Sequence, residues 1–265
     1  MTLQSSYAVI LAFGAALTGG LVGGFALMRR MSLAGDAISH IALPGLAAAL
    51  LLNINPMLGA LVTLLLGALL IWRLEVRTRL DAEVVVGVVF SASLALGGLI
   101  TPREDLIEAL FGGFQQPSDL EFGSAAVLTV AILFALYRWK DGFVINLFSS
   151  ELAASIGLKR SRLDLLFSLI FAMTVLLALR FLGTLLAGAL IVIPAAVARQ
   201  WTSRLRPFFI LSAIVSISSL SVGGAIAAQR GLSLGPAVVI VGAVAFLFSV
   251  PFGRVRWGRQ IPPGP

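Results

Sequence analysis

Long apolar runs, separated by short polar segments, recur along the whole chain. A membrane-spanning helix needs about 20 apolar residues to cross a hydrocarbon core of about 30 Å. Because lipid cannot satisfy backbone polar groups, helices are the default spanning structure. The pattern predicts an all-α, polytopic integral membrane protein with about nine transmembrane helices. The expected spans are residues 7–28, 35–53, 57–73, 84–100, 124–138, 163–180, 183–199, 208–228 and 235–252.

The least marked boundary lies inside one apolar stretch, where we expect a turn at Arg180-Phe181-Leu182-Gly183. Without that turn, the chain would have eight crossings. The basic residues favour nine, with the N-terminus outside and the C-terminus in the cytoplasm. In that arrangement every lysine and arginine except Arg103, Arg180 and Arg230 lies on the cytoplasmic side, as the positive-inside rule predicts.

Composition narrows the class of protein further. The 265 residues are 59% hydrophobic and 12% charged, mean hydropathy is +1.03, and there is no cysteine. Soluble domains carry about 25% charged residues, so an ordinary soluble enzyme is excluded. The absence of cysteine excludes thiolate metal sites and thiol catalysis. The net charge of +7 follows membrane topology, so no nucleic-acid partner is expected.

The domain organisation is simple. We expect one transmembrane domain over residues 1–258, which includes a cytoplasmic segment at 139–164, and a disordered Pro/Gly-rich tail at 259–265. Two overlapping G-x-x-x-G pairs lie in the first span, at Gly19-Gly20 and Gly23-Gly24. Small residues at this spacing let helices approach closely. Packing within the chain is the favoured interpretation, and a dimer face is the alternative.

Asp36 and His40 are polar residues at membrane depth, and His40 is the only histidine of the chain. Four residues apart, they lie on the same face of a helix. If Arg30 marks the cytoplasmic interface, His40 lies about 15 Å deep and Asp36 about 9 Å deep. A carboxylate at such a depth is costly, so it must face protein, water or a cation.

Carboxylate and imidazole together suit a divalent transition metal such as Zn²⁺ or Mn²⁺. One such pair would hold the ion weakly, whereas a second copy of the site across a dimer axis would complete a tetrahedral set. The alternatives are a hydrogen-bonded Asp–His pair that orders helix packing, or a proton relay. Pro44, just beyond the pair, and Pro194 in the seventh span are both expected to bend their helices.

The cytoplasmic segment contains a predicted short helix from Ser149 to Gly157. Ser149 or Ser150 can cap it, Glu151 complements the N-terminal dipole, and Gly157 suits the C′ position. Such a helix could dock on a cytoplasmic partner, or it could be merely a solvated part of the loop. The chain contains no G-x-x-x-x-G-K-[ST] phosphate loop, so it does not hydrolyse ATP by that route.

The run from Met28 to His40, followed by Leu43-Pro44-Gly45, resembles the signature of the zinc/manganese permease family. These proteins are the membrane subunits of ATP-binding-cassette importers for divalent metals, and the zinc-uptake permeases are the most similar branch. Further similar motifs follow in order at 87–91, 108–113, 181–186, 190–199 and 235–239.

The resemblance implies a non-catalytic permease of the bacterial cytoplasmic (inner) membrane. Its partners would be a second copy of itself, two cytoplasmic ATPase subunits, an extracytoplasmic metal-binding protein and membrane lipid. Asp36 and His40 would contact the metal, and Ser150, Glu151, Ala153 and Gly157 would form the coupling helix. No cofactor would be bound permanently, because Zn²⁺, or Mn²⁺ or Fe²⁺, is the transported substrate.

Three alternatives stay open. The first is a secondary cation carrier or channel that uses Asp36 and His40 without an ATPase. The second is an intramembrane enzyme or scaffold, which is disfavoured because the chain offers no other catalytic pair. The third is a permease for metal chelates, whose bulky ligand would not need this paired site.

Overall fold

The computed structural model describes residues 3–31, 34–78, 80–100, 118–148 and 155–253, and every regular element in these ranges is a helix. The predicted tail at 259–265 and most of the predicted coupling helix lie outside the described residues. The helices are α1 (Leu3–Met28), α2 (Ala34–Ile41), α3 (Leu43–Leu51), α4 (Pro56–Thr78), α5 (Ala82–Ile100), α7 (Asp119–Phe148), α9 (Arg160–Trp201), α10 (Leu205–Arg230) and α11 (Leu234–Phe252).

Within the described residues, eight helical stretches are long and apolar enough to cross a membrane. The second consists of α2 and α3 together, Ala34–Leu51. A ninth apolar helix, Leu186–Trp201, is shorter; its 16 residues span about 24 Å. The predicted all-helical, polytopic architecture is therefore confirmed, with eight full-length spans and this one short helix.

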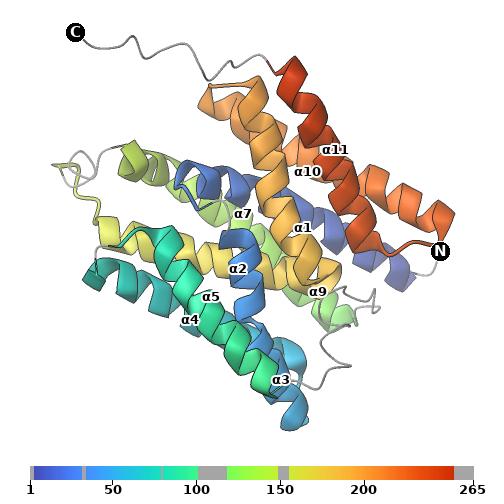
Figure 1. The fold of residues 1–265 in the computed structure, drawn as a ribbon, viewed down its shortest axis with the longest axis horizontal. Coiled ribbons are helices and arrows are strands. Elements are labelled where there is room, and N and C mark those ends of the chain that lie inside the picture. Colours follow the sequence, from blue (N-terminus) through green and yellow to red (C-terminus); the bar gives the residue numbers. More distant parts are fainter. Residues whose placement is uncertain (1–2, 32–33, 79, 101–117, 149–154, 254–265) are drawn as a thin grey trace.

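The predicted turn inside the long apolar stretch occurs at Gly183. Its backbone angles, φ 80° and ψ 168°, interrupt α9 and join two helices end to end. Residues with a Cβ avoid this region, so glycine is required at the bend. Figure 1 shows the yellow first half and the golden second half of α9 running in different directions.

Helix α9 occupies the centre of the molecule. Helices α1, α2, α4, α7, α10 and α11 all pack against it, and its residues Phe167, Phe171, Val175, Leu186 and Ile191 are fully buried. Because both halves of α9 are covered, it serves as the common wall on which the other spans are positioned.

The glycine pairs of α1 pack within the chain, as expected. A Cβ on Gly23 would meet the backbone of Ile191 in α9, and one on Gly20 would meet Ser212 and Ser216 in α10. The two serines also cross to α1, where Ser212 Oγ donates to the Gly20 carbonyl over 2.6 Å and Ser216 Oγ to that of Ala16 over 2.7 Å. Small residues thus allow both a close approach and interhelical hydrogen bonds.

Helix α7 is longer than the predicted span 124–138 and continues to Phe148. Lys140 and Asp141 mark a change of polarity without ending the helix. The next turn carries Phe143, which is 4% exposed, and the neighbouring Val144 and Leu147 also pack against the core. The first ten residues of the predicted cytoplasmic segment 139–164 are therefore helical, because their apolar side chains continue the buried face.

Candidate metal site

The helical break beside the candidate site originates in the Leu43-Pro44-Gly45 sequence. Pro44 has no N–H to donate to the carbonyl of His40, four residues earlier. At the junction between α2 and α3, Ala42 N–H instead donates to Ser39 O over 3.4 Å. The break places His40 in the last turn of α2 and Pro44 in the first turn of α3.

Asp36 and His40 lie together on α2. His40 Nε2 is 3.8 Å from Asp36 Oδ1, which is close enough for an ion pair but too long for a hydrogen bond. The His40 side chain is 17% exposed and that of Asp36 is 61% exposed. The Nδ1 atom of His40 is buried and has no hydrogen-bond partner among the described residues. The pair is therefore not a closed Asp–His hydrogen bond that serves only to order helix packing.

The neighbouring helices hold α2 in place from two sides. On α9, a Cβ at Gly188 would lie 2.8 Å from Asp36 Cα, so the absence of a side chain there lets the two helices meet. On α5, the Phe90 ring lies 5.7 Å from the His40 ring. These contacts fix the backbone of Asp36 and one face of the imidazole, while the carboxylate stays open.

The pair can supply one oxygen and one nitrogen ligand to a divalent cation. No group of three or more His, Cys, Asp or Glu side chains that could hold a metal occurs in the part of the chain that the structure describes. A tetrahedral site would therefore need ligands from outside this part of one chain. A pair without further ligands suits transient contact better than permanent metal storage.

A second polar cluster lies near the ends of α1 and α7 and the start of α9, and sequence reasoning missed it. The carboxylate of Asp164 accepts hydrogen bonds from Arg29 Nη2 over 2.7 Å and from Asn146 Nδ2 over 3.0 Å. Arg160 Nε is 3.5 Å from the same carboxylate, and Arg29 lies over the Phe167 ring at 4.7 Å. Asp164 thus joins three helices at the side where the basic residues gather. Only the Arg160–Asp164 spacing of four residues could have indicated it.

This cluster borders a cavity of about 640 Å³. Glu75 and Asn146 line the cavity, and each has a buried side-chain oxygen without a hydrogen-bond partner among the described residues. Trp72 Nε1 donates to the Ser161 carbonyl over 2.7 Å and so ties α4 to the start of α9. Polar groups of α4, α7 and α9 therefore line the cavity, close to the predicted coupling segment.

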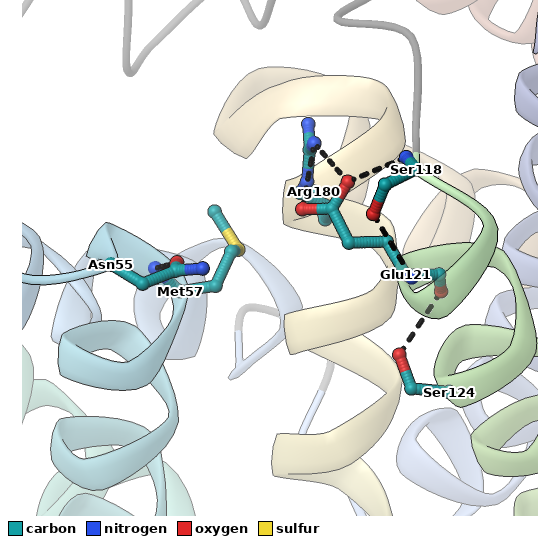
Figure 2. Close-up of polar contacts among 6 residues, drawn as sticks. All are labelled: Asn55, Met57, Ser118, Glu121, Ser124 and Arg180. Carbon is teal, nitrogen blue, oxygen red and sulfur yellow. Dashed lines mark hydrogen bonds and ion pairs between the residues drawn. The ribbon is translucent and has the colours of Figure 1, made fainter.

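At the opposite end of the molecule, Arg180 pairs with Glu121. Figure 2 shows Arg180 Nη2 facing both carboxylate oxygens of Glu121, each at 3.3 Å. Glu121 also belongs to a capping box, because it accepts from Ser118 N–H over 3.0 Å while its own N–H donates to Ser118 Oγ over 3.3 Å. The S-x-x-E spacing could have identified this cap in the sequence. The pair fastens the start of α7 to α9 just before the Gly183 bend.

The structure describes some of the remaining predicted functional residues and not others. Gly157 lies in a turn with φ +79°, the region that suits a helix-terminating glycine. Ser150, Glu151 and Ala153 are outside the described residues. Pro194 lies inside α9, where the only non-helical backbone is at Gly183, so a bend of the helix axis at Pro194 stays a prediction.

A bundle of apolar spans around a bent central helix, with an open carboxylate beside an imidazole, has the features of a membrane permease. The model of the ABC 3 transport family matches residues 3–253, and the chain belongs to this family. The predicted family resemblance is thereby confirmed.

The chain is similar to zinc and manganese permeases along most of their length. The chain is 30% identical over 237 residues to the high-affinity zinc uptake system membrane protein ZnuB of Buchnera aphidicola, covering 87% of this chain and 90% of that protein. It is 30% identical over 246 residues to the manganese import system permease protein ScaB of Streptococcus parasanguinis, covering 91% and 88%. The solved structure of PsaBC from Streptococcus pneumoniae, in complex with a Fab, matches with a TM-score of 0.79 and 28% identity over 94% of this chain and 91% of that chain.

Proposed function

We propose that this chain is the permease subunit of an ATP-driven importer that moves a divalent transition metal into the cytoplasm by alternating access across a homodimer interface. The exposure of Asp36 carries the proposal: its side chain is 61% exposed although it belongs to an apolar membrane span. A carboxylate at membrane depth needs a partner, and a second copy with a passing cation supplies one.

Two copies of the Asp36–His40 pair bring four ligands together, which is the number that a tetrahedral Zn²⁺ site uses. The imidazole favours Zn²⁺, and Mn²⁺ and Fe²⁺ are the alternatives. The described part of each chain contains no group of three or more such ligands, so in this proposal the ion is held when the protomers approach and is released when they separate. Transport requires a site that binds the ion strongly enough for it to enter and weakly enough for it to leave, and such a site meets this requirement.

The partners follow from this assignment. Separate ATPase subunits hydrolyse ATP in the cytoplasm, and an extracytoplasmic protein delivers the metal to the outer face. The N-terminus lies outside, the C-terminus lies in the cytoplasm, and the permease domain covers residues 1–258 in a bacterial cytoplasmic membrane. The segment 139–164, through Ser150, Glu151, Ala153 and Gly157, receives the ATPase.

The test is ATP-dependent Zn²⁺ uptake into vesicles that contain the chain, its ATPase subunits and the binding protein. Asp36→Ala and His40→Ala should each reduce uptake by about tenfold or more. Loss of a metal ligand should weaken metal binding at least as much as loss of an outer-shell group that only hydrogen-bonds to a ligand. Asp119→Ala is the matched control, since it removes an exposed carboxylate at the start of α7. It should transport like the unaltered chain.

Assembly of each variant complex is checked by gel filtration, so that loss of uptake is not loss of folding. Unchanged uptake by both variants would disprove the metal assignment. Uptake that proceeds equally without ATP would identify a secondary carrier instead. Repeating the assay with Mn²⁺ and Fe²⁺ ranks the three metals.

A further inference from the structure

A groove of about 810 Å³ opens on the flank of the molecule between α7 and α10, with α1 as its floor. Figure 1 shows α1 between these two helices. The apolar lining of the groove includes Leu21, Phe25, Leu133, Leu136, Phe209 and Ile210. None of its lining residues lies on α2, α3, α4 or α5, so the groove is built from helices other than those next to Asp36 and His40.

One end of the groove is basic. Lys140 of α7 and Arg206 of α10 are both exposed and line it, and neither forms an ion pair with a described residue. Asp141 is the acidic residue of the lining, which leaves its net charge positive. Lys140 Nζ lies 4.6 Å above the Tyr137 ring, which also lines the groove. The basic end therefore offers two cationic groups on opposite walls.

The polarity changes along the groove in the direction of the membrane normal. Lys140 follows Leu133 by seven residues, or about 10 Å along the helix. On the facing wall, Arg206 lies at the beginning of α10, and Ile210 follows one turn further into the span. Tyr137 and Trp139 are of the types that gather where a membrane meets water. The charged end thus lies at headgroup level and the apolar end among the acyl chains.

We propose that this groove binds an anionic phospholipid of the cytoplasmic leaflet. Its phosphate would lie between Lys140 and Arg206, and an acyl chain would lie along Leu133, Leu136 and Ile210. Basic pockets between transmembrane helices on the cytoplasmic side are suited to such headgroups. A second copy is a poorer occupant, because a two-fold contact at this face would oppose like charges.

The lipid joins α7 to α10 and so stabilises the end of α7, which forms the beginning of segment 139–164. Binding rests on the membrane location of the helices, and only the choice of leaflet rests on the proposed orientation. Because lipid binding is measured without metal, ATP or transport, its failure is distinguishable from failure of the proposed transport function.

The test uses the full chain in detergent micelles, titrated with phosphatidylglycerol and observed by native mass spectrometry. The unaltered chain should retain phosphatidylglycerol in preference to phosphatidylcholine. The double variant Lys140→Gln/Arg206→Gln should lose about tenfold or more in affinity for phosphatidylglycerol, since each basic group at the surface contributes to anionic-lipid binding. The matched control is Arg73→Gln/Arg77→Gln, which removes two exposed basic groups near the C-terminal end of α4. This control should bind phosphatidylglycerol as the unaltered chain does.

A second readout locates the acyl chain. Phosphatidylglycerol with a photoreactive group in its chain should crosslink to Leu133, Leu136 or Ile210, and Ile210→Trp, which fills the groove, should reduce that yield. Equal affinity of the groove and control variants, equal retention of phosphatidylcholine, or full competition by free phosphate would each overturn the proposal. So would a crosslink between the grooves of two copies in place of the lipid adduct.

Discussion

Arg29 and Arg160 reach the same carboxylate, that of Asp164, from surroundings of different polarity. The Arg29 side chain is 15% exposed, makes the shorter contact at 2.7 Å, and also covers the Phe167 ring. The Arg160 side chain is 68% exposed and lies at 3.5 Å. The contribution of an ion pair to the free energy of unfolding depends on how far water screens the two charges. The two arginines should therefore contribute differently to stability although they share a partner.

Arg29→Gln should therefore destabilise the protein by about 3 kcal/mol, because it leaves the Asp164 carboxylate without its principal charge partner in a buried place. Arg160→Gln should cost about 0.5 kcal/mol or less, as is typical of exposed pairs four residues apart on a helix. Denaturant unfolding of the detergent-solubilised chain measures both. Equal losses would show that burial of Asp164 does not set the strength of this cluster.

The separation of two residues along the chain explains which site residues the sequence could predict. Asp36 and His40 are four residues apart on one helix, so their proximity follows from local geometry alone. Arg29 and Asp164 are 135 residues apart, and only the packing of α1 against α9 brings them together. The 61% exposure of Asp36 was likewise not predictable, because it depends on which neighbouring helices leave that face open.

At the scale of elements, α9 depends on one glycine. The bend at Gly183 separates a first half, hydrogen-bonded to α4 at Ser161 and to α7 at Asp164, from a second half that carries Gly188, against which Asp36 packs. The sequence predicted a turn at Arg180-Phe181-Leu182-Gly183, and the distribution of basic residues favoured it. By contrast, α7 continues ten residues beyond the predicted span 124–138, because Lys140 and Asp141 suggest a membrane boundary and helices can continue beyond one.

Gly183→Ala should destabilise the protein by about 1–3 kcal/mol, because alanine is strained at φ 80° and ψ 168°. Gly87→Ala is the matched control: it lies inside α5, and an added methyl group would meet nothing within 4 Å. That variant should be neutral or stabilised by up to about 1 kcal/mol, since alanine is the better helix former. Thermal unfolding followed by circular dichroism gives the comparison. Similar midpoints for both variants would mean that α9 does not require this bend.

At the scale of the whole molecule, the open face at Asp36 and the groove at Lys140 and Arg206 belong to different sets of helices. The first involves α2, α5 and the second half of α9, and the second involves α1, α7 and α10. A protein with one flank against a second copy and another against lipid would need this separation. The predicted fold class did not reveal the separation, because apolar residues serve both kinds of surface equally well.

The separation can be measured because the chain contains no cysteine. In membranes holding the assembled importer, Asp36→Cys should be joined to its counterpart by a short thiol-to-thiol crosslinker, since the proposed dimer axis passes beside this residue. Val127→Cys supplies the comparison, because its side chain is 69% exposed but lies on α7. The same treatment should not join it to its counterpart. If the two variants crosslinked equally, or if only Val127→Cys did, the second copy would have to contact another face, and Asp36 and His40 could not form one four-ligand site.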